Sequence, residues 1–151
     1  MSQVKTAVLT RFGCRETKLY PYPDVQSDGM LVKMISCGVC GTDKHLFDGR
    51  EPSLDLPIIL GHEVLGEVEG VGKQAATTLE VHGERLKKGD RVTWFAAIPC
   101  GECWYCKWAA SNHVGILCEG GKAYGVSMSS RNPPHLFGGY AEYVYILPKT
   151  W

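Results

Sequence analysis

Four closely spaced cysteines restrict the fold of this chain more than any other feature of its sequence. Cys100, Cys103, Cys106 and Cys118 form the pattern C-x2-C-x2-C-x11-C. Zinc in structural sites is tetrahedral and takes thiolates at about 2.3 Å, and two intervening residues let a tight turn direct two sulfurs at one ion. Gly101 eases such a turn. Because four protein ligands leave no open coordination position, the pattern predicts a structural zinc site.

The overall cysteine usage favours metal binding over disulfide bonds. The chain holds 7 cysteines, an odd number, and three of them lie so close together that disulfides among them would have poor geometry. No stretch approaches the roughly 18 to 20 apolar residues of a membrane span, and the segment 1–5 lacks the apolar run of a signal peptide. We therefore expect a cytoplasmic protein, because thiols stay reduced in that compartment.

The charge balance excludes some classes of partner. Lys and Arg total 16, as do Asp and Glu, so the formal net charge is zero. A nucleic-acid or anionic-membrane surface would need a basic face. We expect neither a nucleic acid nor a membrane as partner.

A second group of metal-binding residue types lies upstream of the cysteine stretch. Cys40 is followed by Asp43 and His45, and His62 is followed directly by Glu63. A catalytic zinc needs three protein ligands and one exchangeable position, and Cys40 and His62 are suitable ligands. The carboxylates of Glu63 and Asp43 are candidates for fixing the imidazole tautomer by a hydrogen bond. A lone His is more often a surface or core residue, so these residues alone leave the site open.

The apolar pattern predicts one mainly β domain with one or two short helices. A short helix is expected over 42–47, capped by Thr42 or Asp43 and stopped by Gly49. The polar segment from Lys73 to Lys87 is expected to be a surface loop. Strands are expected where apolar residues alternate or cluster, at Val4 to Leu9, Met30 to Ser36, Glu63 to Gly72, Arg91 to Phe95 and Tyr140 to Leu147.

Five ordered motifs resemble the zinc-dependent alcohol dehydrogenases of the medium-chain dehydrogenase family. The family pattern G-H-E-x2-G-x5-G-x2-small is matched at each spacing, and the other motifs occur in the family's order. The resemblance runs from Val4 to about Pro148. The matching residues are Cys40-Gly41-Thr42-Asp43, Gly61-His62-Glu63 with Gly66, Gly72 and Ala75, Gly89-Asp90-Arg91-Val92, the four cysteines, and Gly139-Tyr140-Ala141-Glu142-Tyr143.

The resemblance implies a fold and a set of zinc ligands. The fold would be a GroES-like, partly open β-barrel, with residues 1–151 forming the catalytic domain and about 96–120 its structural zinc lobe. Cys40 and His62 would hold a catalytic zinc, with Glu63 close enough to help or exchange. The structural zinc would be held by Cys100, Cys103, Cys106 and Cys118.

The resemblance also implies roles in proton transfer and an activity. Asp43 would pair with the His62 imidazole, Thr42 would take the alcohol proton, and His45 would stand at the far end of a relay through the cofactor ribose. An alcohol would be oxidised to an aldehyde or ketone with zinc as Lewis acid and NAD or NADP as hydride acceptor. The expected partners are a small alcohol or carbonyl compound and, for the parent enzyme, further copies of itself. Trp94 and Phe95 would line the pocket or pack in the core.

Three departures from the family pattern affect these expectations. Eleven residues, Lys107 to Leu117, separate the last two cysteines where the family has seven, so the lobe should bulge. The segment from Gly72 to Gly89 is longer than is common. The family continues into a cofactor-binding Rossmann domain, yet G-x-G-x-x-G does not occur here, and no third catalytic ligand follows the last strand. We therefore expect these 151 residues to be inactive alone, with a weakly held or hydrated catalytic zinc.

Three other classes of protein share parts of this pattern. A zinc-finger-like binding module would explain the four cysteines, although the zero net charge and the lack of a basic helix count against nucleic acid. A thiol redox protein would use Cys37 and Cys40 as a C-x-x-C pair with a depressed thiolate pKa. A zinc-stabilised structural or binding module without catalysis is the third alternative.

Overall fold

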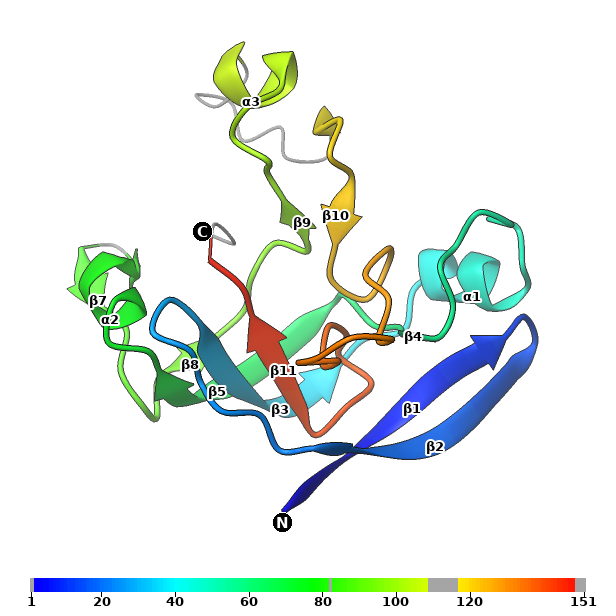
Figure 1. Cartoon of the computed structure of the whole chain (residues 1–151), viewed down its shortest axis with the longest axis horizontal. Helices are drawn as coiled ribbons and strands as arrows, with labels where there is room; N and C mark the ends of the chain where they lie inside the picture. The colour runs from blue at the N-terminus through cyan, green and yellow to red at the C-terminus, as the bar shows by residue number, and fades with distance from the viewer. Residues whose placement is uncertain (1, 82, 109–116, 149–151) are drawn as a thin grey trace.

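The computed structural model describes residues 2–81, 83–108 and 117–148, and this part of the chain is mainly β (Figure 1). It contains eleven strands and three short helices. The predicted mainly β fold is confirmed, although the described residues contain three helices where one or two were expected. None of these helices has the length and apolar character that crossing a membrane requires.

A three-stranded antiparallel sheet contains the start of the chain. Its strand order is β2 (Cys14–Pro21), β1 (Gln3–Arg11) and β4 (Ile58–Ile59). The chain turns between β1 and β2 at Gly13, whose φ of 72° suits glycine. The sequence analysis did not predict β2, because its residues are mostly exposed and polar and show no apolar alternation.

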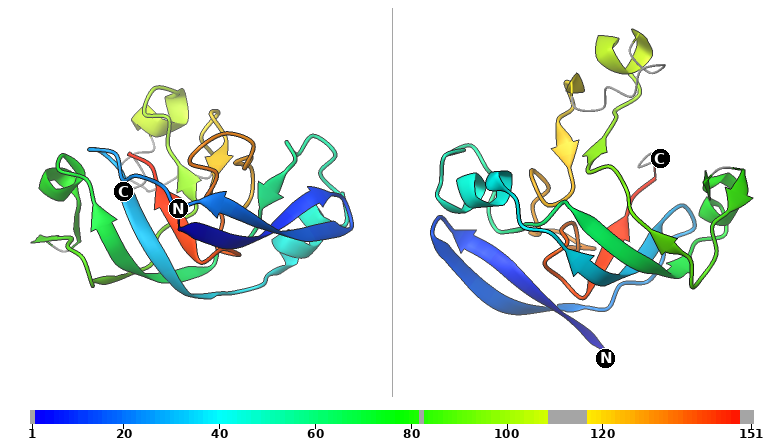
Figure 2. Two further views of the ribbon diagram at one scale, coloured as in Figure 1. Left: turned by 60° about the horizontal axis from the view of Figure 1, so that its bottom comes forward. Right: turned by 180° about the vertical axis from the view of Figure 1, so that it is seen from behind.

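A four-stranded antiparallel sheet forms the centre of the domain. Its strand order is β11 (Tyr143–Ile146), β3 (Met30–Cys37), β5 (Val64–Val71) and β8 (Arg91–Val92). An isolated bridge between Thr6 and Ala141 links it to the first sheet. The predicted strands are confirmed at these places, with shorter bounds for β5, β8 and β11. Figure 2 shows that the sheets curve around a common interior and remain open.

The segment predicted to be a polar surface loop is partly ordered, so that prediction was wrong. It contains helix α2 (Ala75–Thr78) and the hairpin of β6 (Glu80–Val81) and β7 (Glu84–Arg85). Ala75 and Leu79 are each 1% exposed. Two buried apolar side chains therefore fix the segment against the core, although its overall composition is polar.

The core consists of three clusters of buried side chains. The largest joins the four-stranded sheet to α2 and to the base of the cysteine lobe. The second lies between the two sheets, and the third lies under helix α1 (Gly41–Phe47). Their central members are Met30, Val32, Val68, Ile98 and Tyr124 in the first, Val4, Val8, Leu31 and Tyr145 in the second, and Leu9, Leu46, Ile58 and Leu60 in the third.

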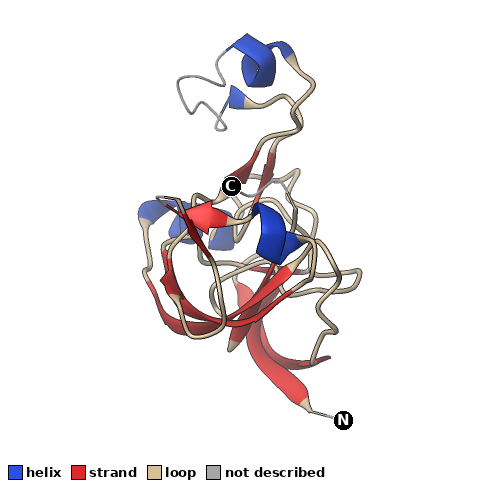
Figure 3. Cartoon of the chain, turned by 90° about the vertical axis from the view of Figure 1, so that its left-hand side faces the viewer, coloured by secondary structure: helices blue, strands red, loops and turns tan. Residues whose placement is uncertain are grey.

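The four-cysteine stretch projects from the body of the domain as a lobe (Figures 1 and 3). It is carried by a two-stranded ribbon of β9 (Ala97–Ile98) and β10 (Lys122–Ala123). Helix α3 (Trp104–Trp108) lies at its tip. Most of the predicted bulge, residues 109–116, lies outside the described residues.

Candidate metal centres

The lobe brings all four cysteines of the first predicted site together. Their sulfur atoms lie within 4.8 Å of one another. The sulfurs of Cys100 and Cys106 are 3.8 Å apart. Two thiolates bound to one tetrahedral zinc at 2.3 Å are also separated by about 3.8 Å. The donor set and its spacing therefore fit zinc.

Backbone N–H groups stabilise the negative charge that a metal-binding thiolate carries. The N–H groups of Glu102 and Cys103 donate to Cys100 Sγ at 3.4 and 3.3 Å. These two bonds are the main reason that the pKa of Cys100 falls to about 6. The N–H of Cys100 donates in turn to Cys118 Sγ at 3.2 Å. Gly101 permits the turn with a φ of 80°. Because this turn directs backbone N–H groups at the sulfurs of Cys100 and Cys118, it favours the thiolate form of these two residues.

The second cluster consists of Cys40, His62 and Glu63. One ligand atom from each lies within 4.8 Å of the others, and Cys40 Sγ is 3.2 Å from His62 Nε2. Cys40 lies in the connection between β3 and α1, while the other two lie in the connection between β4 and β5. Segments separated in sequence thus supply one thiol, one imidazole and one carboxylate to a common point.

The N-terminus of helix α1 positions Cys40. Thr42 and Asp43 were the predicted caps, but the structure corrects this, because Cys40 itself occupies the N-cap position. Its extended backbone, with φ of −114° and ψ of 178°, brings Sγ to the N–H of Thr42 at 3.3 Å. The carboxylate of Asp43 accepts the N–H of Cys40 at 3.0 Å, completing a capping box.

Asp43 is the buried polar centre of this cluster. It is 4% exposed, and its second oxygen, Oδ1, accepts the N–H of Gly61 at 3.0 Å. The same oxygen is 3.7 Å from His62 Nδ1, which is longer than a hydrogen bond. His62 Nδ1 is buried and has no hydrogen-bond partner. With Nε2 directed at Cys40, this arrangement fits an imidazole that binds metal through Nε2 and turns Nδ1–H towards a carboxylate.

The remaining predicted site residues lie around this cluster. Thr42 and His45 are exposed on α1, and Glu63 is exposed just before β5. The structure therefore brings Glu63 and Asp43 to Cys40 and His62, and leaves Thr42 and His45 on the solvent-facing side of the helix.

The other two cysteines lie outside both clusters. All seven cysteines are in the described ranges, and none forms a disulfide. Burial is the main reason that the pKa of Cys37 rises to about 11. A reactive C-x-x-C pair needs a depressed thiolate pKa, so this environment counts against the thiol redox interpretation of Cys37 and Cys40.

Trp94 and Phe95 were expected to line the pocket or to pack in the core, and the structure places them in different environments. Trp94 packs edge-on against Tyr124 at 6.4 Å and against the largest core cluster, whereas Phe95 is 53% exposed.

Tyr140 contacts the Cys40 segment, although the sequence analysis named it only as part of a motif. Its hydroxyl donates to the carbonyl of Gly38, two residues before Cys40, at 3.1 Å. The placement of a tyrosine just after two glycines was the only sequence signal for this contact.

Comparison with known proteins places these clusters in a defined context. Residues 26–151 match the family model described as the alcohol dehydrogenase GroES-like domain. An uncharacterised zinc-type alcohol dehydrogenase-like protein of Bacillus subtilis (strain 168) is 36% identical over 134 residues, which cover 83% of this chain and 32% of the relative.

Two solved structures resemble the domain closely. An alcohol dehydrogenase from Thermotoga maritima has a TM-score of 0.87 and 35% identity, and the match covers 99% of this chain and 40% of that one. A candidate zinc-binding dehydrogenase from Sinorhizobium meliloti 1021, bound to NADP, has a TM-score of 0.77, 32% identity and coverages of 99% and 38%. The chain thus spans about a third of the length of its curated relatives.

Proposed function

Because the chain belongs to the alcohol dehydrogenase GroES-like domain family, we propose that it is the catalytic domain of a zinc-dependent enzyme that oxidises an alcohol to an aldehyde or ketone. The observation that carries this proposal is the meeting of Cys40, His62 and Glu63 at one point. A thiol, an imidazole and an exposed carboxylate leave room for an exchangeable ligand, as a catalytic zinc requires. The closed four-cysteine cluster serves as the structural site.

The residues around the catalytic cluster take distinct roles in this proposal. Cys40 and His62 hold the zinc, and Glu63 assists or exchanges with another ligand. A zinc ion bound there supplies a Lewis acid that polarises the substrate oxygen. Asp43 orients the His62 ring by attracting the proton on Nδ1. The Nδ1 atom lies 3.7 Å from Asp43 Oδ1.

The exposed face of α1 supplies the proposed proton path. Thr42, whose N–H donates to Cys40 Sγ, accepts the alcohol proton on its hydroxyl oxygen. His45 lies three positions further along the same helix, so the two side chains project from neighbouring positions of one face. His45 would stand at the far end of this path, receiving the proton by way of the cofactor ribose when the cofactor is bound and releasing it to solvent.

The wider assignments rest on the family. The substrate is a small alcohol or carbonyl compound, and the hydride acceptor is NAD or NADP, in keeping with the NADP bound to the Sinorhizobium relative. The seven unpaired thiols suit a reducing compartment such as the cytoplasm. The whole enzyme is proposed to be a homo-oligomer.

Zinc content tests the two-site proposal directly. Elemental analysis of the purified chain is expected to give two zinc ions per chain, and mild chelation is expected to remove one, because an open three-ligand site exchanges faster than a closed four-thiolate site. Cys40→Ala should lose only the easily removed zinc. Absence of zinc from a folded, reduced sample would contradict both assignments.

The 151-residue polypeptide alone is proposed to be inactive. Every pairing between strands in the described ranges is antiparallel, whereas a dinucleotide-binding fold is built on parallel strands with a glycine-rich turn. We expect no change in NADH absorbance when the polypeptide is mixed with NAD and a panel of alcohols. Measurable turnover would contradict this proposal and leave the assignment of the zinc ligands unaffected.

A further inference from the structure

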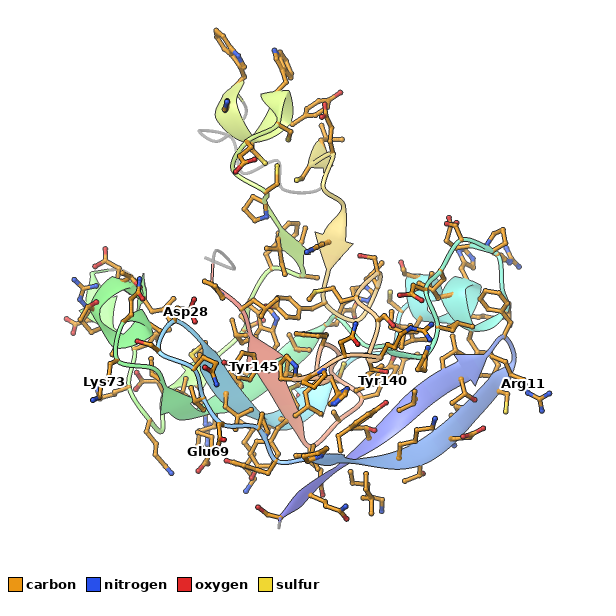
Figure 4. All side chains as sticks on the ribbon, viewed as in Figure 1. Arg11, Asp28, Glu69, Lys73, Tyr140 and Tyr145 are labelled. Atoms are coloured by element: carbon orange, nitrogen blue, oxygen red, sulfur yellow. The ribbon has the colours of Figure 1, made fainter. Side chains whose placement is uncertain are left out.

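Tyr140, labelled in Figure 4, forms hydrogen bonds to both of the segments that carry Cys40 and His62. Its hydroxyl donates to the carbonyl of Gly38 at 3.1 Å, and its backbone N–H donates to the carbonyl of Leu60 at 3.0 Å. One side chain and its own backbone therefore hold a residue shortly before each proposed ligand.

The ring of Tyr140 also covers the backbone next to His62. A Cβ atom built on Gly61 would lie 2.8 Å from Tyr140 Cδ1 and 2.9 Å from Cε1, closer than real contacts allow. The φ of Gly61 is 94°, a conformation that glycine adopts easily. Gly61 thus lets the ring approach the ligand-bearing backbone directly.

Gly38 is held from both sides. Its N–H donates to the carbonyl of Glu63 at 2.7 Å, while its carbonyl accepts the Tyr140 hydroxyl. A Cβ atom on Gly38 would meet Glu63 Oε2 at 2.3 Å. The Tyr140 hydroxyl therefore completes a connection that runs from the loop before Cys40 to the residue after His62.

Packing explains the ring of Tyr140 and leaves the hydroxyl unexplained. The ring touches the second and third core clusters. A phenylalanine would fill the same space. Burial and then the charge of Asp43 raise the pKa of Tyr140, so the hydroxyl keeps its proton and remains a donor.

We propose that the Tyr140 hydroxyl is a positioning group that fixes the Cys40 segment relative to the His62 segment and so sets the zinc affinity of that site. The inference rests on the proposed function, because it assumes that Cys40 and His62 bind zinc. Tyr140 is not itself a predicted ligand. It acts on the metal site through the positions of Cys40 and His62.

Tyr140→Phe tests the inference, with Tyr145→Phe as the matched control. The Tyr145 hydroxyl also forms a hydrogen bond to the backbone, in which it accepts the N–H of Gln26 at 3.0 Å. The ring of Tyr145 belongs to the same second core cluster. Each variant is loaded with zinc, stripped mildly and refilled with Co²⁺. Chelator competition gives the affinity of the refilled site, the visible Co²⁺ spectrum reports its ligand geometry, and circular dichroism confirms the fold.

We expect Tyr140→Phe to bind Co²⁺ about tenfold more weakly at the refilled site, in the range known for groups that orient metal ligands, with a shifted spectrum and an unchanged four-cysteine zinc. Tyr145→Phe should match the wild type. Wild-type affinity and spectrum in Tyr140→Phe, or equal losses in both variants, would overturn the inference. A wild-type chain that takes up no metal beyond the four-cysteine zinc would overturn the proposed function, and this inference with it.

Discussion

Cys103→Ser is expected to abolish zinc binding in the lobe and to unfold it. Helix α3 has five residues, and none of them is buried. Isolated helices shorter than about 12 to 15 residues are marginal in water, and Trp104 and Trp108 are 61% and 73% exposed. The lobe therefore has little apolar burial to hold it, and the free energy of metal binding becomes its folding free energy.

The loss is measured by zinc content, limited proteolysis and thermal unfolding. We expect one zinc per chain instead of two, rapid cleavage within the lobe, and a melting temperature lower by roughly 10 °C. Cys14→Ser is the matched control, because Cys14 lies at the start of β2, outside the four-cysteine cluster and outside the cluster of Cys40, His62 and Glu63. If Cys103→Ser kept two zinc ions and the protease resistance of the wild type, the four-cysteine assignment would be wrong.

The strands that carry apolar alternation were predictable, and the exposed ones were not. β5 alternates because one of its faces packs in the core. β3 begins with an apolar run because both of its faces are buried there, Met30 and Val32 in the first cluster and Leu31 in the second. β2 is stabilised by backbone hydrogen bonds along its full-length pairing with β1. Such bonds require no apolar side chains, so the sequence of a polar strand does not reveal them. Helix α2 was missed for a similar reason, since Ala75 and Leu79 are the only buried residues among the described side chains of the polar segment 73–87.

The residue types of the candidate site were predictable from spacing, whereas their hydrogen bonds were not. Clustering of Cys40, His62 and Glu63 follows from the motif order. The capping role of Cys40 depends on its φ and ψ angles, and the bond from Tyr140 to Gly38 joins residues 102 positions apart. Such bonds depend on how two sheets are packed, which no local pattern records.

Asp43→Asn is expected to weaken both the fold and the catalytic zinc site. Oδ2 of Asp43 accepts the N–H of Cys40, and Oδ1 accepts the N–H of Gly61. An asparagine side chain has one oxygen, so its NH₂ group would face one of these two donors. A buried donor without a partner costs about 1–3 kcal/mol, and the remaining bond loses its charge assistance. We therefore expect a loss of about 2–3 kcal/mol in the free energy of unfolding.

Urea unfolding and zinc competition measure the two consequences of Asp43→Asn. Zinc affinity at the Cys40 and His62 site should fall about 10- to 100-fold, because the His62 ring loses the carboxylate that faces Nδ1. Asp48→Asn is the control: Asp48 pairs with Lys44 on the exposed side of α1, and surface ion pairs contribute about 0–1 kcal/mol. Equal stability of the two variants would show that Asp43 does not hold the two ligand segments together. Wild-type zinc affinity in a destabilised Asp43→Asn would limit its role to the fold.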